Sequence, residues 1–384
     1  MEYVSVREAA EKWGVSPRQV QRLLARGRIH GAIKFGRSWM IPSASEKPGA
    51  RDLPDDLAEF FEATSLPLPK DRPDAILDNV KDERAHQIYK AELAYLRGDF
   101  EPAILCFQES EADNAARLRS CSLAITAAIG SGNYHLYQQI ESYLKEVINK
   151  DIAANVTAAA ELSLATALIG ATAVNMIPEW LKNGDFSALT SQQLRLDAAF
   201  KRARYFQFLK QYESALAVAE TALNIVEPTE GLSTRDIYLR LACASACWAL
   251  GQEDEAKHRL SDVMNDYLPH GFITPFSESV MDFYGLQEQL ITRDFPSYYD
   301  AIAEQISHII PNWIELHNQL TKDSITYILT VREGQMARLA ARGVPFKKIA
   351  ERFQISPGTL NNNMQIIYQK LNIRGKKELS KYVL

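Results

Sequence analysis

A serine followed directly by a proline begins a short amphipathic run near each end of this chain, at Ser16-Pro17 and at Ser356-Pro357. Serine caps the free N–H groups at the start of a helix, and proline suits the first helical position because it has no N–H to leave unpaired. Apolar residues at helical spacing follow both pairs, namely Val20, Leu23 and Leu24 in the first copy and Leu360, Met364, Ile367 and Leu371 in the second. The two ends are therefore expected to fold into similar small helical units.

The N-terminal run has a partner helix just before it. Residues 4–13 carry apolar side chains on one helical face, and Ser5 with Glu8 has the spacing of a capping box. Gly14 tolerates the left-handed conformation that ends a helix, so the two runs are expected to meet at a tight turn. This predicts a helix-turn-helix, in which arginine reads guanine and glutamine reads adenine in the major groove. Four such residues lie on the outer side of the second helix: Arg18, Gln19, Gln21 and Arg22.

A small hairpin, or wing, is predicted directly after this helix pair. The stretch GRIHGAIKFGRSWMIP alternates apolar and polar residues on both sides of a Gly36-Arg37 turn. Lys34 and Arg37 are expected near its tip, where they suit phosphate groups. The longer stretch AAEKWGVSPRQVQRLLARGRIHGAIKFGRSWMIP resembles the excisionase-like, MerR-type winged helix-turn-helix domains, and the resemblance covers about residues 3–42. It implies that this part of the chain binds duplex DNA.

The C-terminal stretch LTVREGQMARLAARGVPFKKIAERFQISPGTLNNNMQIIYQKLNIRGKKEL has three helical patterns in register. Thr330 and Glu333 have the spacing of a second capping box, and Gly343 is placed to close the first helix. The whole stretch resembles the LuxR-type helix-turn-helix domain. The resemblance implies a four-helix domain whose recognition helix, beginning at Ser356-Pro357, enters the major groove of DNA.

This copy departs from the LuxR-type pattern at the start of its recognition helix. The family usually carries Thr-Val-Lys-x-His there, whereas Asn361 and Asn363 replace the Lys and the His. Loss of a Lys removes part of the electrostatic affinity for DNA, but Asn can still read adenine. We expect DNA binding, with lower non-specific affinity, through Lys347, Lys348, Thr359, Asn361, Asn362, Gln365, Lys370 and Arg374. Four further cations surround the motif: Arg332, Arg352, Lys376 and Lys377. A domain that has lost DNA binding and serves as a dimer or RNA polymerase contact is the alternative.

The distribution of charge separates the two ends from the middle. The chain has a net charge of −5, but residues 1–51 carry +6 and residues 329–384 carry +8, which leaves −19 for the 277 residues between them. Basic ends around an acidic centre are expected where only the ends meet a polyanion.

The middle of the chain is predicted to be helical. Residues 44–80 are rich in Pro, Asp and Glu and predict a linker, with a short helix over 55–62. From 81 to 319 the pattern is helical, and Gly98 and Gly132 are 34 residues apart, which is the tetratricopeptide period. Four alignable segments in this region resemble tetratricopeptide-like repeats, irregular in length. Such repeats stack into a solenoid, whose concave surface is expected to take a peptide, protein or small-molecule effector.

Several other classes of function have no support in the sequence. The four cysteines form no metal or redox motif and are expected to be reduced core residues. There is no GxxxxGK[ST] phosphate loop, nucleophile–base pair or pair of carboxylates at catalytic spacing, so we predict no enzyme, cofactor or metal site. The polar stretch MEYVSVREAAEKWG does not predict a signal peptide. The most apolar run, residues 155–177, contains Glu161 and is expected to be a buried helix rather than a membrane span.

These patterns predict a mainly α protein with four parts: a winged helix-turn-helix (1–43), a Pro-rich linker (44–80), a tetratricopeptide-like domain (81–319) and a LuxR-type domain (325–384). We expect a cytoplasmic, sequence-specific transcription regulator that binds double-stranded DNA as a homodimer, with RNA polymerase as a further contact. The alternative is a repeat-based adaptor whose terminal domains dock on proteins rather than DNA.

Overall fold

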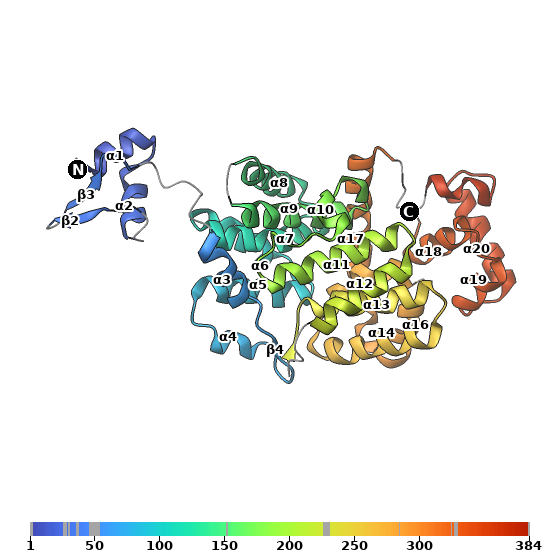
Figure 1. Cartoon of the computed structure of the whole chain (residues 1–384). Coiled ribbons are helices and arrows are strands. Elements are labelled where there is room, and N and C mark those ends of the chain that lie inside the picture. The colour runs from blue at the N-terminus through green and yellow to red at the C-terminus, as the bar shows by residue number, and fades with distance from the viewer. Residues whose placement is uncertain are drawn as a thin grey trace.

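The structure is a computed structural model that describes residues 3–25, 29, 31–35, 38–45, 54–150, 153–225, 231–283, 285–323, 325 and 329–382. A small α/β unit comes first, a large helical body follows, and a third, helical unit comes last (Figure 1). The predicted mainly α fold is therefore confirmed. Among the described residues, no helix is both long and apolar enough to cross a membrane.

The N-terminal unit combines two short helices with a small sheet. Its elements are β1 (Tyr3–Ser5), α1 (Val6–Trp13), α2 (Pro17–Ala25), β2 (Ile33–Phe35) and β3 (Ser38–Pro42). The strands are antiparallel in the order β1-β3-β2, and Lys34 lies opposite Trp39 in the β2–β3 hairpin. The predicted hairpin is thus present, while its Gly36-Arg37 turn lies outside the described residues.

The first helix begins at Val6, two residues later than the apolar pattern predicts. Ser5 is extended, with φ −74° and ψ 166°. Its hydroxyl accepts a hydrogen bond from the Glu8 N–H (3.3 Å), and the Glu8 carboxylate accepts one from the Ser5 N–H (2.7 Å). The predicted capping box is confirmed, and it fixes the start of the helix because a capping residue is itself not helical. Residues 3–5 therefore stay extended and pair with β3.

The body is built mainly from antiparallel pairs of helices. Its helices are α3 (Pro54–Ala63), α4 (Ala75–Asn79), α5 (Glu83–Leu96), α6 (Glu101–Glu109), α7 (Asn114–Gly130), α8 (Tyr134–Asn149), α9 (Ala154–Gly170), α10 (Glu179–Asn183), α11 (Gln192–Phe208), α12 (Tyr212–Ile225), α13 (Asp236–Ala249), α14 (Glu253–Tyr267), α15 (Thr274–Phe283), α16 (Leu286–Asp294) and α17 (Tyr299–Thr321). Short 3-10 turns are η2 (Ser110–Ala112), η3 (Val174–Met176), η4 (Leu268–His270) and η5 (Pro296–Tyr298). Each helix from α5 to α9 packs on the next, α9 packs on α11, and α11 to α14 continue the series.

The turns that follow α5, α7, α9, α11 and α13 each contain a residue with positive φ. Glycine supplies it at Gly98, Gly132 and Gly251. Thr172 after α9 and Lys210 after α11 take the same left-handed conformation, with φ 55° and 61°. The five turns are therefore 34 to 41 residues apart, although only three of them contain glycine. This order is compatible with a repeat array, and the tetratricopeptide assignment stays a prediction.

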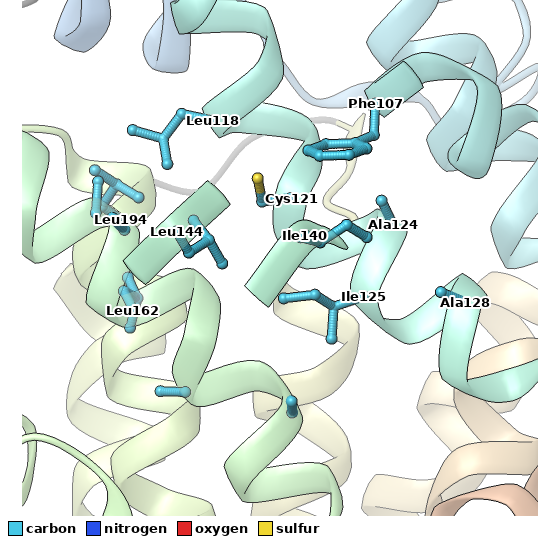
Figure 2. Packing of buried hydrophobic residues seen from close by; sticks show 14 of the residues in the cluster. Phe107, Leu118, Cys121, Ala124, Ile125, Ala128, Ile140, Leu144, Leu162 and Leu194 are labelled. Carbon is cyan, nitrogen blue, oxygen red and sulfur yellow. The ribbon is translucent and has the colours of Figure 1, made fainter. Parts of the chain in front are cut away.

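Two large hydrophobic clusters fill the body. Figure 2 shows part of the first cluster, where side chains of α6, α7, α8, α9 and α11 gather. Cys121 lies at its centre and is fully buried, and all four cysteines are free and buried, as predicted. Burial raises the pKa of Cys106 to about 11 and that of Cys243 to about 12, so these thiols stay protonated and unreactive at neutral pH.

The predicted linker over residues 44–80 is shorter in the structure. Helix α3, close to the short helix expected there, buries Leu57, Phe60 and Phe61 in the body. Leu68 and Ile76 are also buried, and β4 (Leu68–Pro69) pairs with β5 (Gly231–Leu232). The apolar residues between the prolines explain the difference, because burying each such side chain contributes about 1.5–3 kcal/mol. Residues 54–80 therefore belong to the body.

Helix α17 crosses the C-terminal ends of α7 and α9. Asn312 donates from Nδ2 to the Gly130 carbonyl (2.9 Å), and its own carbonyl accepts from the Tyr134 hydroxyl (2.8 Å). His317 Nδ1 lies 2.7 Å from the Ala171 carbonyl oxygen. The helix is thus fixed to backbone groups where α7 and α9 end, and the chain then leads into the third unit.

The C-terminal unit consists of α18 (Val331–Ala341), α19 (Phe346–Arg352), α20 (Pro357–Lys370) and the 3-10 turn η6 (Lys376–Lys381). Its apolar residues share one hydrophobic cluster with α15 and α16 of the body. Gln335 of α18 donates from Nε2 to the Val280 carbonyl (2.9 Å), and Arg332 pairs with Glu288 (3.2 Å). The unit therefore packs on the body through α18.

Candidate DNA-binding surfaces

Helix α2 has a buried apolar face and an exposed polar face. Val20 and Leu24 lie in the small core of the N-terminal unit with Ala9 and Ala10 of α1. Two of the predicted base-reading residues are exposed: Arg18 and Gln21. The side chains of the other two, Gln19 and Arg22, lie outside the described part of the chain. The two described side chains are placed as a recognition helix requires.

The hairpin carries one described cation. Lys34 is exposed, and its Nζ lies 5.8 Å from the centroid of the Trp39 ring. This cation–π contact holds the ammonium group on the outer surface of the strand pair. Arg37, the second predicted wing cation, lies outside the described residues, so the structure places only one of the two.

Helix α20 also has one buried and one exposed face. The predicted apolar stripe is buried, with exposed fractions of 5% or less: Leu360, Met364, Ile367 and Leu371. The predicted base-reading residues are all exposed: Thr359, Asn361, Asn362 and Gln365. The helix thus offers a polar surface to a groove while its other side is held in the domain core.

The start of α20 is fixed by its cap. The Ser356 hydroxyl accepts a hydrogen bond from the Thr359 N–H (3.0 Å) and lies 2.8 Å from the Thr359 hydroxyl. Asn363, the third asparagine of the run, is half-buried, and its Nδ2 lies 3.7 Å from Met336 Sδ of α18. The first two asparagines of the run therefore face outward, and the third faces the domain core.

One residue of the exposed surface escaped the sequence analysis. Ile366 is 44% exposed beside Gln365, on the same side of α20 as the polar residues. An isoleucine that lies outside the buried apolar stripe is the signal that could have identified it. In a major groove, an aliphatic side chain can contact the methyl group of thymine.

The cations around α20 differ in their surroundings. Lys347 and Lys348, in the first turn of α19, are exposed, as is Arg374 beyond the end of α20. Lys370 is exposed too, but its Nζ donates to Glu333 Oε2 at 2.7 Å. Lys370 is therefore held by a carboxylate of its own domain, and its predicted contact with DNA phosphate stays a prediction.

Glu333 completes the second predicted capping box, which the structure confirms. Its carboxylate accepts from the Thr330 N–H (2.8 Å), and the Thr330 hydroxyl accepts from the Glu333 N–H (3.2 Å). Burial would raise the pKa of Glu333, but the hydrogen bonds from Lys370 and Thr330 outweigh it and lower that pKa. The carboxylate is therefore ionised at neutral pH and holds Lys370 in place.

Two arginines expected to hold phosphate make contacts with the body. Arg332 pairs with Glu288 of α16 and donates from Nη2 to the Phe353 carbonyl at 3.1 Å. The Arg352 guanidinium lies 5.0 Å from the centroid of the Trp248 ring of α13. Docking of the domain thus brings both arginines to acidic and aromatic groups of the body, while Arg332 stays 45% exposed, and their contact with phosphate stays a prediction.

The described residues provide no metal site. Among them, no three His, Cys, Asp or Glu side chains lie close enough to share an ion. His258 Nε2 lies 3.5 Å from Asp262, and His135 Nε2 lies 3.1 Å from the amide of Gln139. These histidines have ordinary helical i, i+4 neighbours.

Comparison with known protein families gave two matches. The family described as bacterial regulatory proteins, luxR family, matches residues 327–383, and the family described as helix-turn-helix domain matches residues 3–45. No curated protein and no solved structure gave a match to the chain. Residues 327–383 are therefore a LuxR-family helix-turn-helix domain, and residues 3–45 are an excisionase-like helix-turn-helix domain, which together give this chain two domains of DNA-binding regulators.

Proposed function

We propose that this protein is a sequence-specific transcription regulator that places α20, and separately α2, in major grooves of duplex DNA. The position of α20 carries the proposal. Its apolar face is buried in its own domain, α18 and the end of α19 contact the body, and none of the described residues covers its polar face. A groove-sized helix with one uncovered polar face is what base readout requires.

The exposed residues divide into two roles. Asn361 and Asn362 have the amide groups that pair with adenine N6 and N7, and Arg18 of α2 has the donors that pair with guanine. Lys347 and Lys348 hold phosphates, which fixes the register of α20 on the duplex but carries no sequence information. In the C-terminal domain, the base-reading residues of α20 therefore lie beside the phosphate-binding residues of α19.

The body has a separate role in this proposal. One recognition helix reads only a few base pairs, so a homodimer is expected, with half-sites about one helical turn, 34–36 Å, apart. The body would hold the dimer or an effector, and RNA polymerase is a further expected contact. Such a protein acts where chromosomal DNA lies, in the cytoplasm, and needs no catalytic step.

Salt dependence separates this proposal from an adaptor with protein-docking ends. Lys347, Lys348 and Arg374 are three exposed cations beside α20. Three phosphate contacts give a slope of about −2.7 for the logarithm of affinity against the logarithm of salt concentration. An adaptor has no such slope on DNA.

The test is selection of duplexes from a random pool by the full-length protein, followed by affinity measurements at several salt concentrations. A recurring sequence motif is expected. Arg18→Ala should weaken binding to it by about 5- to 150-fold and relax the choice of base. Arg7→Ala, which removes an exposed arginine of α1 paired with Glu11, is the matched control and should change neither. If no duplex is enriched and no binding depends on salt, the adaptor becomes the better description.

A further inference from the structure

A cavity of about 910 Å³ lies within the body. Residues of the first helices of the pairs, α5, α7, α9, α11 and α13, line it together with residues of α15, α16, α17 and α18. Its volume falls in the range of sites for small molecules, roughly 300–1,000 Å³. Helix α17 already lies across the ends of α7 and α9, where a partner helix would otherwise dock, which favours a small ligand over a helical peptide.

Five charged side chains form a row along one wall of this cavity, in the order Arg119, Glu92, Arg235, Asp197 and Lys201. Arg119 Nη2 lies 2.6 Å from Glu92 Oε1, and Lys201 Nζ lies 2.5 Å from Asp197 Oδ1. Arg119 and Lys201, at the two ends of the row, are therefore each paired with a carboxylate. The row holds three cations and two carboxylates, which leaves one positive charge without a counterpart.

Arg235 is the cation of this row that has no hydrogen-bonded carboxylate. Its Nη2 lies 3.9 Å from Glu92 Oε1, and its Nη1 lies 4.0 Å from Asp197 Oδ2. Both distances exceed the roughly 2.7–3.2 Å of a hydrogen bond, and no residue that the structure describes accepts one from this guanidinium. Burial, and then repulsion from Arg119, lower the pKa of Arg235. Arg235, whose side chain is 17% exposed, is therefore only loosely paired with these two carboxylates and keeps hydrogen-bond donors for a further acceptor.

The remainder of the cavity wall is largely apolar and includes Phe200, Ile306 and Trp313. Helix α18 contributes Gln335, whose Oε1 is buried and has no hydrogen-bond partner among the described residues. A ligand that fills the space would therefore meet an arginine on one side, hydrocarbon around it, and the first helix of the LuxR-family domain on another side.

We propose that this cavity binds a small organic anion with an apolar body, whose carboxylate pairs with Arg235 while its body contacts α17 and α18. One carboxylate neutralises the row of five charges and accepts from the free guanidinium donors. Because α18 both lines the cavity and anchors the DNA-binding domain to the body, an occupant changes the contacts that hold this domain. The effect of the ligand on the DNA-binding domain rests on the proposed function, whereas ligand binding itself does not.

Binding is tested by calorimetry on the full-length protein with octanoate, octanol, octylammonium and the fluorescent anion 8-anilinonaphthalene-1-sulfonate. At least one of the two anions should bind with a dissociation constant below about 1 mM. Octanol and octylammonium should bind at least about tenfold more weakly than octanoate, because they lack the carboxylate. If neither anion binds, or if octanol matches octanoate, the proposal is wrong.

Arg235→Gln separates a ligand-binding role from a structural one. The variant should lose at least about tenfold in anion affinity, yet its melting temperature without ligand should be unchanged or higher, because it removes a partly buried guanidinium that has no hydrogen-bonded carboxylate. Arg72→Gln, which removes an exposed arginine paired with Asp78, is the matched control and should change neither quantity. A lower melting temperature of Arg235→Gln with unchanged anion affinity would show that Arg235 is only structural.

Coupling to DNA is measured separately, as the affinity of the full-length protein for its selected duplex with and without the bound anion. A change of about 5- to 150-fold is expected, and Arg235→Gln should abolish it. Anion binding without any change in DNA affinity would overturn only the proposed coupling between the cavity and DNA binding. Failure to bind any DNA would overturn the proposed function and leave the calorimetric result standing.

Discussion

Trp313 of α17 lies directly against Gly170, the last residue of α9, and a Cβ on Gly170 would overlap Cζ3 and Cη2 of the indole ring. The missing side chain is what lets α17 approach the end of α9 so closely. His317, one turn further along α17, lies 2.7 Å from the Ala171 carbonyl and extends the same contact. The helix that leads toward the DNA-binding domain is therefore fitted to one backbone position of the body.

Gly170→Ala should destabilise the protein. The new methyl group must displace the Trp313 ring, and overpacking of this kind costs about 1–3 kcal/mol of unfolding free energy, measured by urea denaturation. Gly358→Ala is the control, because its nearest neighbour would be Ser356 Oγ at an ordinary 3.7 Å. That variant should be neutral or more stable by about 0.4–1 kcal/mol, since alanine restricts the unfolded chain. Equal effects at both positions would show that the indole contact is not tight.

The buried pair of Arg119 and Glu92 should be costly to break. Both side chains are less than one-tenth exposed, and Arg119 also donates from Nε and Nη2 to Thr64, just after α3. Arg119→Met leaves the Glu92 carboxylate buried without its closest cation, which should cost about 3–5 kcal/mol of unfolding free energy. The double variant Arg119→Met/Glu92→Leu should recover most of this loss in chemical denaturation. A double variant as unstable as the single one would contradict the explanation.

Asn361→Lys should strengthen non-specific binding to DNA. The Asn361 side chain is exposed on α20, so a lysine there can reach a phosphate and should steepen the salt slope by about 0.9. Titrations of an arbitrary duplex at several salt concentrations measure both effects. Asn149→Lys makes the same charge change at an exposed position at the end of α8 and should leave the slope unchanged. An unchanged slope for Asn361→Lys would mean that this position does not face the duplex.

Lys370→Met should lower stability at neutral pH but not in acid. The pKa of Glu333 is lowered in the folded protein, so its pairing contributes stability above the unfolded pKa, near 4.5, and this is lost as pH falls through the lower folded value. The variant should therefore be less stable by about 0.2–1 kcal/mol at pH 7, and the difference should shrink as pH falls below about 4.5 and disappear below the folded pKa of Glu333. Unfolding free energies across pH 3–7 provide the measurement.

Lys347→Met is the control for this pH dependence. Lys347 is exposed, and among the described residues it has no carboxylate within ion-pair distance. Its substitution should leave stability nearly unchanged at every pH. A pH-dependent loss as large as that of Lys370→Met would show that the effect comes from overall charge and not from the Glu333 contact.

Only some of the turns between the helices of the body could be predicted from the sequence. Gly98 and Gly132 reveal their turns because glycine is the residue that most readily takes positive φ. Thr172 and Lys210 take the same conformation, but their residue types do not predict it. The packing of the surrounding helices accommodates the left-handed turn there, so the series of turns is longer than its glycines indicate.

The sequence by itself determined where the first helix of each terminal unit begins, because capping depends on residues only three positions apart. Ser5 with Glu8, and Thr330 with Glu333, form the boxes that their spacing predicts. Tertiary structure alone decided that Arg332 and Arg352 contact Glu288 and Trp248 of the body, while Lys347 has no such contact among the described residues. It also brought Arg119, Lys201 and Arg235 to one cavity wall from three different helices or their ends. Contacts between residues far apart in the sequence depend on how the helices pack, and no local pattern along the chain specifies them.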